Sequence, residues 1–186
     1  MGGFITPTLN YSLLAPIMIV LAGALIGVLV EAFASRDRRA GIQLPLTLIT
    51  LSFSLGWLFS IRGSEATDLA GNSVVFDGSA FLIQSFVLIF SILGALLIAD
   101  EKNFTSSASA LPGSREELEA TAAGVRVTEI YPLLLFTISG MMLFPVSTDL
   151  ITLFVALELL SLPLYLLTGL SRRRRLMSQE AALKYF

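Results

Sequence analysis

The sequence predicts an all-α protein that crosses a membrane several times. Of its 186 residues, 55% are hydrophobic and 14% are charged, whereas a soluble domain carries about 25% charged residues. The apolar residues form continuous runs, without the alternation of polar and apolar residues that a membrane β-barrel requires. A run of about 20 apolar residues crosses about 30 Å of hydrocarbon as a helix. These observations argue against an ordinary soluble domain.

Five segments are long and apolar enough to span the bilayer, and a sixth begins close to the end of the chain. In hydrocarbon the backbone N–H and C=O groups must be satisfied inside the protein, so each segment is expected to be a helix. We expect a single membrane domain over residues 1–186, with the N-terminus outside and a polar cytoplasmic loop at 100–127. The expected helices cover about 13–34, 43–61, 79–99, 128–146 and 148–170, and the sixth starts at about 178.

The first segment shares one feature with a cleaved signal peptide. Ala32–Ala34 is a small-x-small pattern of the kind at which signal peptides are cut. However, residues 1–12 contain no Lys or Arg, and Arg36, Arg38 and Arg39 follow the apolar run. This is the reverse of signal-peptide polarity, so we interpret the segment as a retained helix.

The distribution of basic residues predicts the orientation of the chain. From the N-terminal tail through the five successive loops, Lys and Arg number zero, three, one, three, zero and four, ending in the run Arg172–Arg175. Cytoplasmic loops of membrane proteins are enriched in Lys and Arg. The N-terminus is therefore expected on the outer side of the cell inner (plasma) membrane. Recognition of lipid headgroups is the alternative explanation of these basic clusters.

Composition also excludes several kinds of functional site. The chain has no cysteine and no histidine, and its net charge is −2. Without these side chains it cannot form a disulfide, a cysteine-ligated iron–sulfur cluster, a Ser-His-Asp triad or an imidazole metal site. It also lacks the overall basic charge that nucleic-acid binding favours. We therefore expect no cofactor, no metal and no nucleic-acid partner for this chain.

Four residues in or beside the expected helices have structural explanations. Gly23 and Gly27 form a GxxxG spacing, which is typical of close contact between membrane helices. Glu31 lies about one turn from the cytoplasmic end of the first helix, where it could snorkel or pair with a residue of the loop. Asp149 opens the fifth helix, where a carboxylate caps free N–H groups.

Glu158 is different, because it is expected at the middle of the membrane. It lies ten residues after Thr148, which corresponds to about 15 Å along a helix. An acidic residue at the bilayer centre costs about 2.5–3.5 kcal/mol even on the mild scales. We interpret Glu158 as a functional carboxylate that transfers protons. The alternative is a protonated glutamate that forms a hydrogen bond between helices.

The residues that follow Glu158 could support proton transfer. Ser161 and Tyr165 lie three and seven residues later, on the same helical face, where a polar stripe could hold water. Pro163 has no N–H, so the carbonyl of Leu159 loses its normal helical partner. A bent helix with a free carbonyl could admit water at this depth. A simple proline kink is the alternative interpretation.

Lys184 is the second candidate for proton transfer. In a helix that begins near Ser178, it would lie about 9 Å from the start. Glu180 precedes it by four residues, which is the order that favours an ion pair. A hairpin of the fifth and sixth helices could bring Lys184 within a turn of Glu158, and making and breaking that pair could load and release a proton. Alternatively, Lys184 snorkels to the cytoplasmic face.

The last fifth of the chain resembles a known family. The resemblance rests on Asp149-Leu150, Phe154, the run Glu158–Tyr165, the basic loop and the run Ser178–Phe186. In these residues the chain is similar to the subunit N family of bacterial respiratory complex I, the NADH–quinone oxidoreductase. The outside N-terminus expected from the loop charges agrees with that family.

The resemblance implies an antiporter-like, proton-translocating membrane subunit that couples quinone reduction to proton pumping. It implies no redox centre on this chain, because the flavin, the iron–sulfur clusters and the quinone belong to other subunits. The implied partners are other membrane-arm subunits, the lipid bilayer, protons and internal water. Glu158 falls on the fifth-helix glutamate of the family, and Lys184 falls on its sixth-helix lysine. Family members have about fourteen helices, so the resemblance also implies that this chain is an N-terminal fragment.

Two other functions remain open from the sequence. The chain could belong to a large subunit of a multisubunit cation/proton antiporter, since those subunits are related and carry a similar buried Glu and Lys. It could also be a non-catalytic membrane scaffold, with Glu158 as a protonated hydrogen-bond donor.

Overall fold

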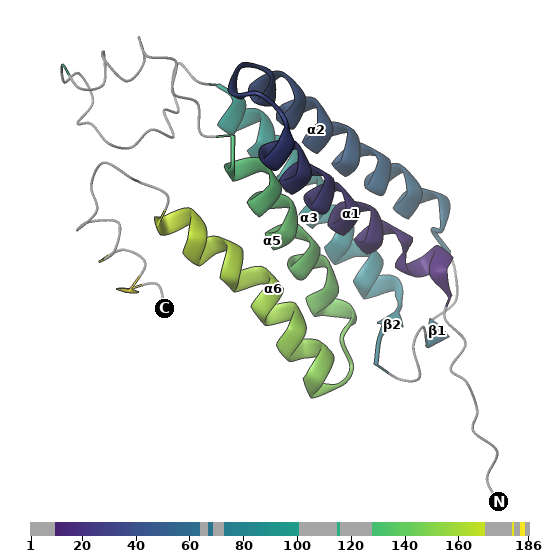
Figure 1. The fold of residues 1–186 in the computed structure, drawn as a ribbon. Coiled ribbons are helices and arrows are strands. Elements are labelled where there is room, and N and C mark those ends of the chain that lie inside the picture. The colour runs from purple at the N-terminus through teal and green to yellow at the C-terminus, as the bar shows by residue number, and fades with distance from the viewer. Residues whose placement is uncertain are drawn as a thin grey trace, which may run out of the picture.

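The computed structural model describes residues 10–63, 67–68, 73–100, 115, 128–169, 180 and 183–184. Long helices make up most of this part of the chain, joined by a short antiparallel strand pair (Figure 1). The elements in chain order are α1 Tyr11–Phe33, α2 Arg36–Ser60, β1 Thr67–Asp68, β2 Val75–Phe76, α3 Gly78–Ala99, α5 Ile130–Leu143, the 3-10 helix η1 Phe144–Val146 and α6 Leu150–Gly169.

The structure confirms an all-α, multi-span membrane protein. Helices α1, α2, α3 and α6 are each long and apolar enough to cross a bilayer. The fourth expected span is formed by α5, which has 14 residues, and by the three residues of η1. It is shorter than the others, so five full spans remain a prediction, as does the orientation. The loop 100–127, the arginine run and the sixth helix lie almost wholly outside the described residues.

Helix α2 begins earlier than the sequence pattern suggested. It starts at Arg36 rather than near residue 43, because only Ala34 and Ser35 have extended backbone angles between α1 and α2. The basic residues that follow α1 therefore belong to the first turns of α2 rather than to an open loop. A helix N-terminus repels positive charge, so Arg39 is expected to need an acidic partner nearby.

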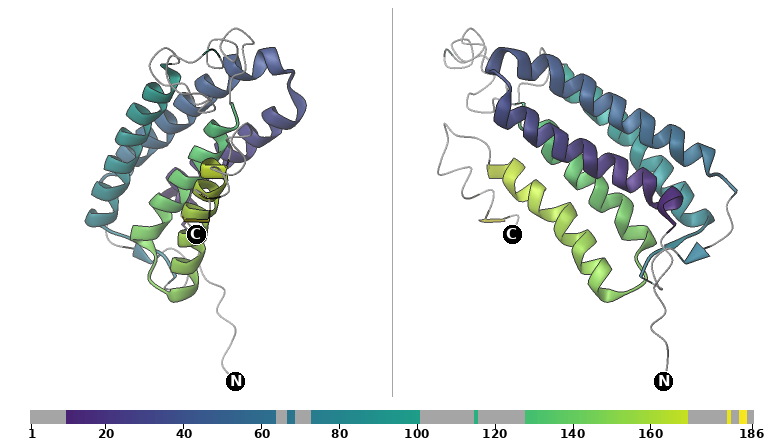
Figure 2. Two further views of the ribbon diagram at one scale, coloured as in Figure 1. Left: turned by 90° about the vertical axis from the view of Figure 1, so that its left-hand side faces the viewer. Right: turned by 45° about the vertical axis from the view of Figure 1, so that its right-hand side comes forward.

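The helices pack into a bundle in which α6 lies at one side. Helix α1 packs against α2 and α5, α3 packs against α2 and α5, and α6 packs chiefly on α5 (Figures 1 and 2). The centre of the bundle is filled by fully buried apolar side chains from these helices. They include Val20, Leu51, Leu58, Leu88, Leu135, Ile138 and Met142.

The outward-facing side chains of the bundle are largely apolar, and several interior ones are polar. On α2, Ile49 and Phe53 are exposed while Thr47 and Ser54 are fully buried. A soluble protein would have the reverse arrangement. In a bilayer the lipid tails are as apolar as leucine side chains. Polar side chains are therefore more stable where they face other helices, with which they can form hydrogen bonds, than where they face lipid. The distribution is what a membrane environment favours.

Helices α1 and α2 are held together at a proline and at two glycines. Pro16 has no N–H for the carbonyl of Ser12, and the Trp57 side chain donates its Nε1–H to that oxygen at 2.9 Å. A Cβ at Gly23 would lie 2.7 Å from the Thr50 Oγ1. A Cβ at Gly27 would lie 3.3 Å from Oε1 of Gln43, also on α2, and 3.0 Å from Cβ of Pro132 on α5. The close contact predicted from the GxxxG spacing is therefore confirmed.

The strand pair lies between α2 and α3, and the residues just before β2 are bonded to the start of α6. In β1 and β2, Thr67 pairs with Phe76 and Asp68 with Val75. Val74 then forms a β-bridge with Ser147, and the Thr148 N–H donates to the carbonyl of Ser73 at 3.1 Å. These bonds fix the point at which α6 begins.

Two of the helices that start at this end of the bundle, α3 and α6, carry an aspartate cap. The Asp149 carboxylate accepts hydrogen bonds from the N–H groups of Ile151 and Thr152, each at 2.8 Å, which confirms its predicted role. The backbone and hydroxyl hydrogen bonds from Thr152 lower the pKa of Asp149 below its ordinary value. Asp77 caps α3 in the same way, through the Ala80 N–H at 2.7 Å.

Candidate functional site

Glu158 occupies the middle of α6. It is the ninth of the 20 residues of this helix and the only charged one among them, so it lies about 12 Å from the helix start. Its side chain is half-buried. The structure thus places a single ionisable group near the centre of an apolar helix.

Glu158 lies on the side of α6 opposite its contact with α5. Ala156 is fully buried, with its carbonyl oxygen at that contact, and Glu158 lies two residues later, about 200° around the helix axis. One turn on either side of Glu158, Phe154 and Leu162 are exposed. Within the described residues, Glu158 has no hydrogen-bond or ion-pair partner.

The three supporting residues expected after Glu158 lie in the same helix. Ser161 is half-buried, and its hydroxyl donates to the carbonyl of Leu157 at 2.6 Å, which leaves its lone pairs free to accept. Tyr165 is half-buried too, and Pro163 is buried inside the helix. The positions agree with the expected polar stripe, whereas a role in holding water stays a prediction.

Lys184 forms the ion pair that the spacing predicted. Its Nζ lies 2.6 Å from the Glu180 Oε1, four residues earlier, so this pair is confirmed. The Lys184 side chain is 75% exposed, and its recorded ion pair is with Glu180 rather than Glu158. Most of the expected sixth helix lies outside the described residues, so a Glu158–Lys184 pair stays a prediction.

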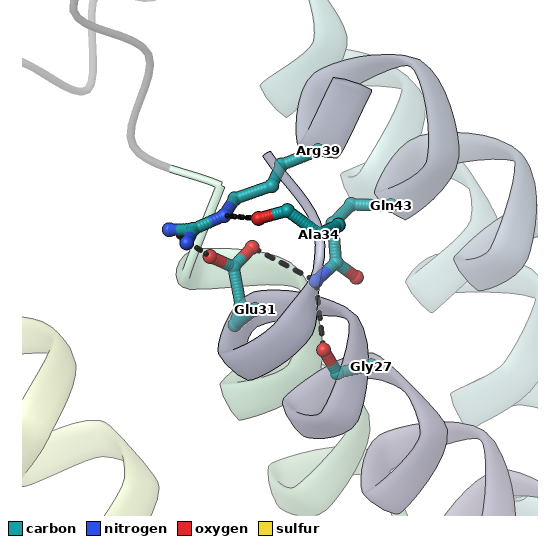
Figure 3. A network of polar contacts seen from close by, with 5 residues as sticks. All are labelled: Gly27, Glu31, Ala34, Arg39 and Gln43. Atoms are coloured by element: carbon teal, nitrogen blue, oxygen red, sulfur yellow. Dashed lines mark hydrogen bonds and ion pairs between the residues drawn. The ribbon is translucent and has the colours of Figure 1, made fainter. Parts of the chain in front are cut away.

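A second carboxylate, Glu31, has a full set of partners at the end of α1 (Figure 3). Its Oε2 lies 3.3 Å from Nη1 of Arg39, and its Oε1 accepts a 2.8 Å hydrogen bond from Nε2 of Gln43. Arg39 also donates through Nε to the carbonyl of Ala34, at 3.0 Å, and Gln43 donates to that of Gly27, at 2.9 Å. The sequence predicted that Glu31 snorkels or pairs with a residue of the loop. Pairing is confirmed, but the partner, Arg39, lies in the first turns of α2 rather than in a loop.

A buried polar stripe runs along α2, and sequence reasoning missed it. Gln43, Thr47, Thr50 and Ser54 lie at helical spacing and are all buried. The Ser54 hydroxyl donates to the carbonyl of Pro16 at 2.8 Å. Within the described chain, Oε1 of Gln43 and Oγ1 of Thr47 have no hydrogen-bond partner. The i, i+4, i+7, i+11 spacing could have revealed the stripe, because it marks one face of a helix.

The part of the chain that the structure describes contains no group of three or more acidic side chains that could hold a metal ion.

Comparison with known proteins adds an independent line of evidence. No protein-family model matches this chain. The chain is 48% identical over 185 residues to the NADH-quinone oxidoreductase subunit N of Acidothermus cellulolyticus. It is 44% identical over 189 residues to the subunit of that name from Thermobifida fusca. It is 41% identical over 204 residues to the subunit of that name from Mycobacterium tuberculosis.

These alignments cover nearly all of this chain but only part of each relative. In all three, 97% of this chain is aligned, against 36%, 34% and 38% of the relatives. The chain thus spans about a third of the length of the relatives it matches. The resemblance found in the sequence is confirmed: the chain is homologous to part of NADH-quinone oxidoreductase subunit N.

Proposed function

We propose that this chain is part of a proton-translocating membrane subunit of NADH-quinone oxidoreductase, and that Glu158 takes up and releases protons within it. The observation that carries the proposal is the lone, half-buried carboxylate at the middle of α6, with no partner among the described residues. The similarity to subunit N supports the assignment to this complex.

The contrast with Glu31 supports a functional explanation of Glu158. Glu31 is neutralised by Arg39 and hydrogen-bonded by Gln43, so its charge is compensated inside the bundle. Glu158 has no such compensation among the described residues, although an acidic residue at the bilayer centre costs about 2.5–3.5 kcal/mol on insertion scales. We infer that this uncompensated carboxyl group serves the exchange of protons.

The residues near Glu158 define how a proton would move. Without histidine or cysteine, a path through this chain must use carboxylate, lysine, hydroxyl groups and water. Ser161 and Tyr165 would hold water on the Glu158 side of α6. Lys184, on the following helix, would favour the ionised carboxylate when it is near and the protonated one when it is distant. Electron transfer from NADH to quinone would take place on other subunits of the complex.

The assembled membrane arm of the complex would be the partner of this chain. The open face of α6 would meet further helices there, and the N-terminus would lie on the outer side of the inner membrane. The names of the relatives favour an NADH-quinone oxidoreductase over a cation/proton antiporter.

The proposal is tested by replacing Glu158 in the full-length subunit within its complex. Glu158→Gln keeps the shape of the side chain and removes its ionisation, whereas Glu158→Asp keeps a carboxylate. In inverted membrane vesicles, we expect NADH-driven proton uptake to fall by at least about tenfold with Gln and to be partly retained with Asp. Glu31→Gln is the matched control, because that carboxylate is paired, and it should pump normally. Full pumping by Glu158→Gln would refute the proposal.

A further inference from the structure

We propose that Gly140 of α5 is a positioning residue for Glu158, because it allows the backbone of α6 to lie directly against α5 at the level of that carboxylate. This inference rests on the proposed function of Glu158. Gly140 has no group that binds or donates a proton, and it acts only through the position of α6.

The contact at Gly140 involves backbone atoms on both sides of Glu158. A Cβ at position 140 would lie 2.5 Å from the backbone N of Leu160, 2.8 Å from the carbonyl carbon of Leu159 and 2.9 Å from the carbonyl oxygen of Ala156. Gly140 is itself buried. Hence α6 is in contact with α5 through the segment that carries Glu158, and only a residue without a side chain leaves room for it.

The other glycines of the described helices differ from Gly140 in what they face. At Gly23 the three nearest atoms all belong to the Thr50 side chain, which can change its rotamer. At Gly56 and Gly94 a Cβ would meet nothing within 4 Å. At Gly140 all three atoms belong to the backbone of α6, which, unlike a side chain, cannot relieve a clash by changing its rotamer. An added methyl group at this position must move a whole helix.

The size and direction of that movement follow from the packing. Ordinary contact begins at 3.4 Å, so relief of the 2.5 Å approach requires a displacement of about 0.9 Å. Helix α5 is held by α1, α2 and α3, whereas α6 packs chiefly on α5. Helix α6 is therefore the one that moves. Because Glu158 lies on its far face, the carboxylate is carried outward, away from α5.

A displacement of this size matters for proton transfer. A misplacement of about 1 Å at a reacting group can cost about a hundredfold in rate. Proton transfer also requires donor and acceptor within hydrogen-bond reach, directly or through one water. Gly140→Ala should therefore reduce pumping without altering any ionisable residue.

The experiment compares three Gly→Ala variants of the full-length subunit in its complex. Each replaces a helical glycine, and so carries the same gain of about 1 kcal/mol in intrinsic helix propensity. Gly140→Ala tests the proposal. Gly94→Ala controls for the added methyl group in open space, and Gly23→Ala controls for a tight helix contact that does not involve α6.

Two measurements separate positioning from general stability. The first is NADH-driven proton uptake per assembled complex in inverted vesicles. The second is the infrared band of the Glu158 carboxyl group, assigned by its loss in Glu158→Gln. We expect Gly140→Ala to lower the pumping rate by about tenfold or more and to shift the carboxyl band. Gly94→Ala and Gly23→Ala should leave that band in place.

The possible results distinguish this inference from the proposed function. Normal pumping and an unshifted band in Gly140→Ala, together with inactive Glu158→Gln, would overturn the positioning role and leave the function of Glu158 standing. Full pumping by Glu158→Gln would overturn both. If Gly140→Ala reduces the amount of assembled subunit, Ala156→Ser instead enlarges a fully buried side chain of α6 at the residue whose carbonyl oxygen lies in this contact. The same band shift is then expected, and an unshifted band would overturn the inference.

Discussion

The ion pair between Glu31 and Arg39 should contribute measurably to the stability of the α1–α2 hairpin. The two charged groups lie 3.3 Å apart, and their side chains are 13% and 25% exposed. Exposed pairs contribute at most about 1 kcal/mol, whereas breaking a fully buried pair costs about 3–5 kcal/mol. That larger cost includes the unpaired charge left behind, which a double-mutant cycle cancels, so we expect a coupling energy of about 1 kcal/mol for this partly buried pair.

A double-mutant cycle measures this coupling directly. Glu31→Gln and Arg39→Gln are made singly and together in the full-length subunit, and the free energy of unfolding is followed in mixed detergent micelles. Each single variant also loses or alters bonds to Gln43 or Ala34, and the cycle cancels those contributions. If the free-energy changes of the two single variants sum to that of the double variant within about 0.5 kcal/mol, the pair contributes nothing beyond its separate hydrogen bonds.

Three further predictions concern the free energy of unfolding. The hydrogen bonds from Ala80 and Ser79 hold the pKa of Asp77 below its ordinary value of 3.8. This cap therefore contributes fully above pH 4, its contribution is lost as pH falls through the lowered pKa, and Asp77→Asn should flatten that part of the pH–stability profile. Thr47→Val should leave stability unchanged or raise it, because the buried Thr47 hydroxyl lacks a partner in the described chain. Ser54→Ala should cost about 1 kcal/mol, because it removes a buried hydrogen bond.

The sequence predicts the membrane class because the hydrophobic runs determine it by themselves. Residue spacing also predicts local features that depend on only a few neighbours. The Asp149 cap and the Glu180–Lys184 pair are of this kind, and the structure contains both. Each of them depends on helix geometry that holds wherever the helix is placed.

Features that depend on the arrangement of helices could not be predicted in this way. The backbone contact at Gly140 exists because α6 lies across that turn of α5, which no local pattern encodes. The polar stripe on α2 is visible in the spacing, but its burial depends on α1 packing against it. The early start of α2 was missed because charged residues suggest a loop, whereas Arg39 is compensated here by Glu31.

The positions of the two membrane-embedded carboxylates within their helices determine which partners can reach them. Glu31 lies two residues from the end of α1, and an arginine just after the turn reaches it. Glu158 lies 11 residues from the end of α6, a distance of about 16 Å along the axis. An arginine side chain in a loop cannot span that distance. Any positive side chain that compensates Glu158 must therefore come from another helix at the same depth.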